Sequence, residues 1–93
     1  MFDKMKQLME MKRQADQIKR QLDAERVESE DVRGIKIVIN GAQRIESIDV
    51  DQNFLNPANK SQLEKDLLRS VNSAIAKSQQ LAAQKMKSMM PGF

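Results

Sequence analysis

Two identical triplets, Lys12-Arg13-Gln14 and Lys19-Arg20-Gln21, stand seven residues apart near the start of the chain. Lysine ammonium and arginine guanidinium groups both bind phosphate oxygens, and arginine often does so through two parallel hydrogen bonds. Glutamine side chains reach phosphates or the edges of bases. Because residues seven apart lie on one side of a helix, the repeat and Lys6 predict a row of cations about 21 Å long.

The same repeat also has a purely structural explanation. Lysine and arginine lay their long stems beside apolar surface and keep the charged group in water. Charged residues also flank the apolar seam of paired helices without any ligand. From the residues alone, a phosphate-binding row and a solvated helix rim both remain open.

Other chemistry is poorly represented in the chain. Neither cysteine nor histidine is present, which excludes thiolate nucleophiles, thiolate metal sites and imidazole bases. The carboxylate pairs Glu28/Glu30 and Asp49/Asp51 are spaced to share a strand face, but acids at strand ends are usually only solvated. Three glycines do not make a phosphate-binding loop. We therefore expect no enzyme activity, no metal and no cofactor.

The 93 residues predict one domain, residues 1–93, with a small core. A chain of this length buries only about 60–65% of its unfolded surface, and this one has three Phe, no Trp and no Tyr. Oligomerisation is a common remedy for a small core, so we expect it here. No apolar run resembles a signal peptide or a membrane span, which favours a soluble cytoplasmic protein.

The net charge of +3 is unevenly distributed along the chain. Residues 1–24 carry six bases and four acids, residues 25–51 four bases and seven acids, and residues 52–93 six bases and two acids. The three segments therefore carry +2, −3 and +4. Two basic ends around an acidic middle are expected if only part of the molecule meets a polyanion.

Residues 3–24 are predicted to form the helix that carries the cation row. They contain no Gly or Pro and are rich in good helix formers. An apolar seam with alternating steps of three and four residues runs along them: Leu8, Met11, Ala15, Ile18 and Leu22. The methionines at both ends of the chain predict a flexible helix–helix interface or, alternatively, a promiscuous protein-binding surface.

Residues 26–51 are predicted to form three strands. Ile35, Ile37 and Ile39 alternate with other residues, as in a strand buried on one face. Asn40-Gly41 then predicts a two-residue type I′ hairpin turn. The return strand places Ile48 and Val50 on one face. Because Ile45 is out of phase with them, we expect a bulge or an exposed pairing surface there.

A second long helix is predicted over residues 57–89, followed by a short tail, residues 90–93. Asn56-Pro57 supplies a cap followed by proline in the first turn, and Pro91-Gly92 ends the helix. The resulting order predicts an α+β fold of the form α-β-β-β-α, with a three-stranded antiparallel sheet. Neither helix can lie wholly on so small a sheet, so both must project and can pair within the chain or across a dimer.

This layout resembles the YbaB/EbfC family of bacterial nucleoid-associated proteins. The resemblance covers nearly the whole chain and is most specific in the Ile39-Asn-Gly-Ala42 hairpin and the Met90-Pro-Gly-Phe93 ending. Two features depart from many relatives. The stretch Glu28 to Gly34 replaces a glycine-rich segment, and the first helix starts without a glycine-rich leader.

The resemblance implies a tweezers-like homodimer that is joined through its sheets and binds duplex DNA, without a cofactor, in the nucleoid. It implies roles in nucleoid organisation and gene regulation. By position, DNA would be met by Lys6, Lys12, Arg13, Lys19, Arg20, Lys77, Lys85 and Lys87. The corresponding dimerisation residues would be Ile35, Ile37, Ile39, Ile45, Ile48 and Val50, although the helical seams are also candidate interfaces.

A second hypothesis is a non-enzymatic adaptor that holds partner helices between its methionine-rich arms. It predicts salt-tolerant association with a protein and only non-specific affinity for DNA. A role on a membrane surface is weaker, because only Phe2 and Phe93 lie near an end of the chain and no Trp is present.

Overall fold

The computed structural model describes residues 2–89 and has the predicted order of elements. The elements are α1 (Phe2–Ala24), β1 (Arg26–Val32), β2 (Ile35–Asn40), β3 (Ile45–Val50), the 3₁₀ turns Gln52–Phe54 and Pro57–Asn59, and α2 (Lys60–Met89). The α-β-β-β-α order and the three-stranded antiparallel sheet are thereby confirmed. The predicted tail, residues 90–93, lies outside the described residues.

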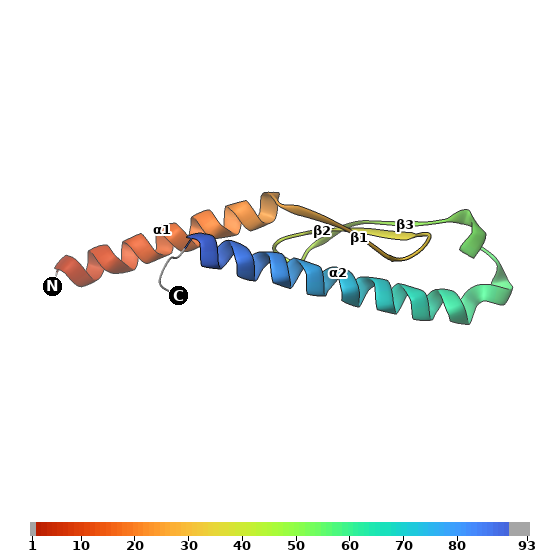
Figure 1. Cartoon of the computed structure of the whole chain (residues 1–93). Helices are drawn as coiled ribbons and strands as arrows, with labels where there is room; N and C mark the ends of the chain where they lie inside the picture. The colour runs from red at the N-terminus through yellow and green to blue at the C-terminus, as the bar shows by residue number, and fades with distance from the viewer. Residues whose placement is uncertain (1, 90–93) are drawn as a thin grey trace.

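The molecule is a long rod of 67 × 19 × 17 Å. The sheet has the order β1-β2-β3, and α2 lies along one of its faces (Figure 1). Beyond the sheet, the C-terminal half of α2 continues beside α1, which projects from the same end of the sheet (Figure 1). Within residues 2–89, neither helix has an apolar stretch suited to crossing a membrane.

The core lies between β2 and α2. Ile35, Ile37 and Ile39 are fully buried, as their alternation predicted. Small side chains on α2 let this helix approach the strand closely; they are Ser70, Ala74 and Ser78. The three isoleucines are therefore enclosed within one chain, between β2 and α2.

The other three predicted dimerisation residues lie on β3, at the edge of the sheet. Their pairing partners place them on the same face as the buried isoleucines: Ile45 with Ile39, Ile48 with Ile37, and Val50 with Ile35. Ile45 and Val50 are half-buried, whereas Ile48 is exposed. A register shift between Val38 and Ile39 inserts one extra residue on β3, which confirms the bulge expected from the phase of Ile45.

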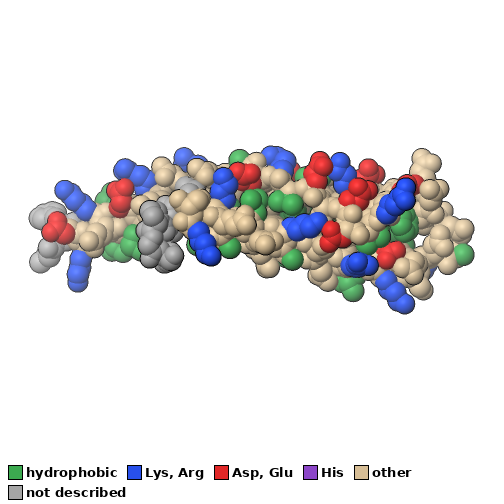
Figure 2. Space-filling view, viewed as in Figure 1, with side chains coloured by type: hydrophobic (Ala, Val, Ile, Leu, Met, Phe, Trp, Pro, Cys, Tyr) green, Lys and Arg blue, Asp and Glu red, His purple; other side chains and the backbone are tan. Residues whose placement is uncertain are grey.

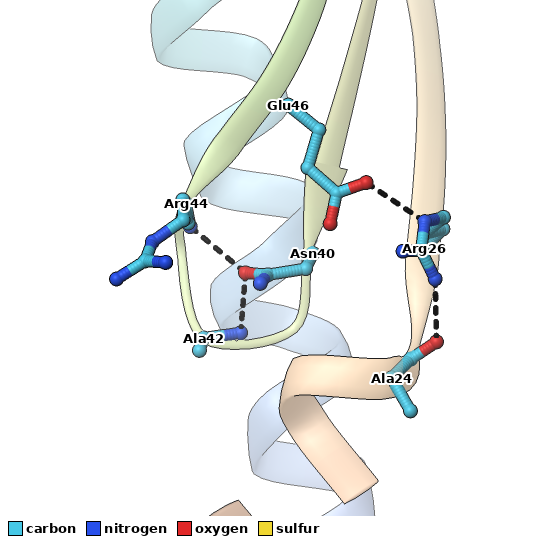
Figure 3. Close-up of polar contacts among 6 residues, drawn as sticks. All are labelled: Ala24, Arg26, Asn40, Ala42, Arg44 and Glu46. Carbon is cyan, nitrogen blue, oxygen red and sulfur yellow. Dashed lines mark hydrogen bonds and ion pairs between the residues drawn. The ribbon is translucent and has the colours of Figure 1, made fainter. Parts of the chain in front are cut away.

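The β2–β3 hairpin has a three-residue loop, Gly41 to Gln43, so the predicted two-residue type I′ turn is wrong. The backbone N–H of Asn40 donates to the Arg44 carbonyl at 2.9 Å, and Gln43 has a φ of 65°. Asn40 Oδ1 accepts hydrogen bonds from the N–H groups of Ala42 and Arg44, at 3.0 and 2.9 Å (Figure 3). Three-residue loops ending in a left-handed residue are the next commonest hairpin connection.

Gly41 has a different role from the one that the turn prediction gave it. Its backbone N–H donates to the carbonyls of Leu22 and Glu25 at 2.9 and 3.1 Å, so the loop satisfies acceptors at the C-terminal end of α1. A Cβ atom at residue 41 would lie 2.9 Å from the Leu22 carbonyl oxygen and 3.2 Å from Leu22 Cα. Glycine is required here for close approach of the loop to α1.

The second helix begins slightly later than predicted. Asn56 Oδ1 accepts a hydrogen bond from Ala58 N at 3.0 Å, but the segment that it caps is the 3₁₀ turn Pro57–Asn59. The α-helix proper starts at Lys60.

Candidate nucleic-acid interface

All five predicted cations of the first helix are exposed on α1: Lys6, Lys12, Arg13, Lys19 and Arg20. Between residues 3 and 23 of this helix, only Ile18 is buried and only Leu22 is half-buried. None of the five cations has an ion-pair partner among the residues that the structure describes. Blue side chains are prominent along α1, while red ones are more frequent over the sheet (Figure 2). The projecting helix therefore presents uncompensated positive charge.

Three of these cations also line one shallow depression on α1. Its volume is about 400 Å³, and its lining residues are Met9, Lys12, Arg13, Asp16, Gln17 and Arg20. The hollow is edged by one ammonium and two guanidinium groups, which can bind a phosphate oxygen, and by the Asp16 carboxylate, which opposes it. Gln17 was not among the predicted site residues, although its spacing of four and three residues from Arg13 and Arg20 places it on their side of the helix.

The lysines of α2 have a different environment. Lys77 Nζ lies 2.7 Å from Asp31 Oδ1 and donates to Ser29 Oγ at 3.1 Å, and Lys85 Nζ lies 2.9 Å from Glu25 Oε1. Lys87 is exposed and has no ion-pair partner within residues 2–89. Two of the three α2 lysines that were predicted to contact DNA, Lys77 and Lys85, are thus paired with acids of β1 and of the α1–β1 junction. Within residues 2–89, the cations of α1 and the lysines of α2 therefore do not form one groove of unpaired positive charge.

Asp31 is the acid that fixes α2 to β1. Its carboxylate accepts hydrogen bonds from the Lys77 ammonium and the Ser73 hydroxyl. These two groups hold the pKa of Asp31 below its ordinary value, because both stabilise the charged carboxylate. The charged form therefore stabilises the fold above the ordinary aspartate pKa of about 4, and this contribution is lost as the pH falls through the lowered value.

Asp31→Asn should lower the melting temperature at neutral pH, and the difference from the unmodified chain should shrink as the pH is lowered to about 2. Thermal unfolding followed by circular dichroism over this range measures the effect. Glu30→Gln is the matched control, because Glu30 is an exposed acid on the same strand with no ion pair among the described residues. A pH-independent difference for Asp31→Asn would contradict the role of its charge.

The sheet face that α2 leaves uncovered is also charge-compensated. Arg26 Nε lies 2.7 Å from Glu46 Oε2, reaching from β1 to β3 across β2 (Figure 3). Lys36 Nζ lies 3.3 Å from Glu28 Oε1. Within residues 2–89 no group of acids is arranged to hold a metal ion. The uncovered sheet face therefore has two of its cations paired with acids, whereas the five predicted cations of α1 have no ion-pair partner among the described residues.

Two comparisons with known proteins relate the chain to DNA-associated proteins. The sequence profile of the YbaB/EbfC DNA-binding family matches residues 1–93. A protein from Syntrophobacter fumaroxidans named "Nucleoid-associated protein" is 32% identical over 59 residues, which are 63% of this chain and 54% of that protein. The matched segment therefore spans about half the length of this relative.

Proposed function

The chain belongs to the YbaB/EbfC DNA-binding family, and on that premise we propose that it binds duplex DNA in the nucleoid as a homodimer, without enzymatic activity. The proposed contacts are made mainly to the phosphate backbone. The observation that carries the proposal is the set of exposed cations on α1 without ion-pair partners among the described residues.

The proposed DNA surface is centred on α1. It consists of Lys6, Lys12, Arg13, Lys19 and Arg20, with Lys87 of α2 as an addition. Lys77 and Lys85 contribute less, because a phosphate must compete with Asp31 and Glu25 for their ammonium groups. Duplex DNA carries one negative charge for about every 1.7 Å of its axis, so a cation row of about 21 Å spans many phosphates.

Duplex DNA fits this surface better than single strands do. Proteins that hold single strands stack the bases on aromatic side chains, and this chain has three Phe, no Trp and no Tyr. Contacts to phosphates fix position on the duplex but carry little sequence information. Weak sequence preference then favours a role in nucleoid organisation, with effects on gene expression that follow from DNA architecture.

A salt titration of duplex binding tests the proposal. If each dimer neutralises about four to six phosphates, the logarithm of the binding constant should fall against the logarithm of salt concentration with a slope of about −4 to −5. Two unrelated duplexes of equal length should give the same slope and similar affinities. A slope near zero, or retention of only one of the two sequences, would contradict backbone binding.

A further inference from the structure

The two α2 lysines that are paired with acids lie along one ridge of that helix. Ser73, Lys77 and Lys85 are separated by multiples of four residues, which places them on one side of a helix. Asp31 accepts hydrogen bonds from Ser73 and Lys77, and Glu25 pairs with Lys85. Asp31 lies near the end of β1, and Glu25 lies just before the strand begins. The ridge therefore follows an edge strand of the sheet, and each of its ammonium groups is paired with an acid of the same chain.

The two lysines are held with different strength. Lys77 Nζ donates to Asp31 Oδ1 at 2.7 Å and to the oxygen of the buried Ser29 at 3.1 Å. Lys85 Nζ lies 2.9 Å from Glu25 Oε1, which is its one acidic partner among the described residues, and these two side chains are 32% and 39% exposed. An ion pair that is open to water is weak, because both charges remain partly solvated. Lys85 is therefore the lysine that a competing anion displaces more easily from its partner.

The part of α2 that carries Lys85 lies beside the helix that carries the unpaired cations. Met86, the next residue, lines a groove of about 380 Å³ together with Lys19 and Leu22 of α1. The C-terminal end of α2 runs alongside α1 beyond the sheet (Figure 1). A duplex that binds the cations of α1 therefore brings its phosphates close to Lys85.

We propose that Glu25 is an internal competitor of DNA, whose carboxylate occupies Lys85 and keeps this lysine out of the DNA contact. The proposal rests on the proposed function and identifies a residue that limits its affinity. While the pair is intact, Lys85 neutralises Glu25 instead of a phosphate, so it releases no counterion from the duplex. Loss of the Glu25 charge frees the ammonium group and adds one phosphate contact to those of α1. The acid thus keeps the affinity for DNA below the value that the lysines of the chain permit.

Two other acids near the cations of α1 differ from Glu25 in this respect. Asp16 and Asp23 are exposed on α1, and neither has an ion-pair partner among the described residues. They lower the positive potential around the helix, but they occupy no particular lysine. Asp23 is two residues from Glu25 in the chain, so comparison of the two separates the effect of an ion pair from the effect of a negative charge.

Glu25→Gln should raise the affinity for duplex DNA by about 10-fold at moderate salt, the effect of one additional charge-assisted hydrogen bond to phosphate. The slope of the logarithm of the binding constant against the logarithm of salt concentration should become more negative by about 0.9. Fluorescence anisotropy of a labelled duplex over a salt series measures both quantities.

The fold should tolerate this substitution. The backbone carbonyl of Glu25 accepts the hydrogen bond from Gly41 N–H at 3.1 Å, and this contact does not involve the side chain. Circular dichroism checks that the variant is folded. If it were not, Glu25→Asp would replace it, because withdrawal of the carboxylate by one methylene weakens the pair and should give a smaller gain in the same direction.

Asp23→Asn is the matched control, because it removes one carboxylate from nearly the same place without freeing a lysine. It should raise the affinity by no more than about twofold through the long-range field, and it should leave the salt slope unchanged. Equal gains from Glu25→Gln and Asp23→Asn would overturn the proposal.

Lys85→Gln, introduced into each of these chains, shows whether the gain passes through this lysine. In the unmodified chain and in the Asp23→Asn variant, it should lower the affinity by less than about twofold, whereas in the Glu25→Gln variant it should cancel the gain. An equal effect of Lys85→Gln in all three chains would overturn the proposal, because independent charges act additively. A large loss in the unmodified chain would also overturn it, since Lys85 would then contact DNA despite Glu25.

Failure of this inference and failure of the proposed function give different results. If the unmodified chain and all its variants show no salt-dependent binding of duplex DNA, both are overturned. If the unmodified chain binds with a slope of about −4 to −5, but Glu25→Gln and Asp23→Asn have the same effect, the proposed function stands and only the role of Glu25 is overturned.

Discussion

Replacing Arg13 and Arg20 together by glutamate should reduce the affinity for duplex DNA by at least about 100-fold at moderate salt. Each arginine is expected to make charge-assisted hydrogen bonds to phosphate, worth about 1.5–3 kcal/mol each, and loss of two such bonds corresponds to this factor. The introduced carboxylates add repulsion. Both residues line the same depression on α1, so they are expected to act on one stretch of backbone. Fluorescence anisotropy of a labelled duplex measures the affinity.

The matched control is the double substitution Arg33→Glu and Lys65→Glu. It changes the net charge by the same amount, and both residues are exposed outside α1 with no ion-pair partner among the described residues. Its effect should be several-fold smaller and limited to the long-range field of the protein. Equal losses for the two double variants would show that net charge, rather than the α1 surface, determines binding. Full affinity of the α1 variant would remove this surface from the site.

Gly41→Ala should destabilise the fold by about 1–3 kcal/mol, the usual cost of inserting a methyl group into a tightly packed place. The added Cβ would lie 2.9 Å from the Leu22 carbonyl oxygen and 3.2 Å from Leu22 Cα, and these are backbone atoms that cannot rotate away. In a domain of this size, that loss lowers the melting temperature by roughly 10 °C. Thermal unfolding at fixed pH and protein concentration gives the value.

The same substitution should loosen α1 more than the sheet. Hydrogen exchange should therefore accelerate in the last turns of α1 while β2 remains protected. Ala42→Ser is the control, since Ala42 is the exposed neighbour in the same loop. A melting temperature within about 1 °C of the unmodified chain would mean that the loop can move off α1 at little cost.

The elements were predictable because their periodicities are strong. The alternation of Ile35, Ile37 and Ile39 gave the buried strand, and the seam of α1 gave both its length and its apolar side. The side of α1 that bears Arg13 and Arg20 also followed from the seven-residue repeat. These features depend on neighbours in sequence, and the packing of the chain preserves them.

Features that depend on contacts between elements were not predictable. Asn40-Gly41 matches a two-residue turn, but the loop also meets the end of α1, and the approach to Leu22 requires the glycine. Lys77 and Lys85 look equivalent to the cations of α1 in the sequence, yet Asp31 and Glu25 approach them from elements far away in the chain. The coverage of the β2 isoleucines by α2 likewise depends on how the last helix folds back.

The rod-like shape has a practical consequence for measuring the size of this protein in solution. Its radius of gyration is 18.5 Å, whereas a compact domain of the same length has a value of about 12 Å. By the same scaling, 18.5 Å is expected of a globular chain of about 270 residues. A gel-filtration column calibrated with globular standards would therefore overestimate the mass of one copy. Light scattering or sedimentation equilibrium, which do not assume a spherical shape, are required to count the chains.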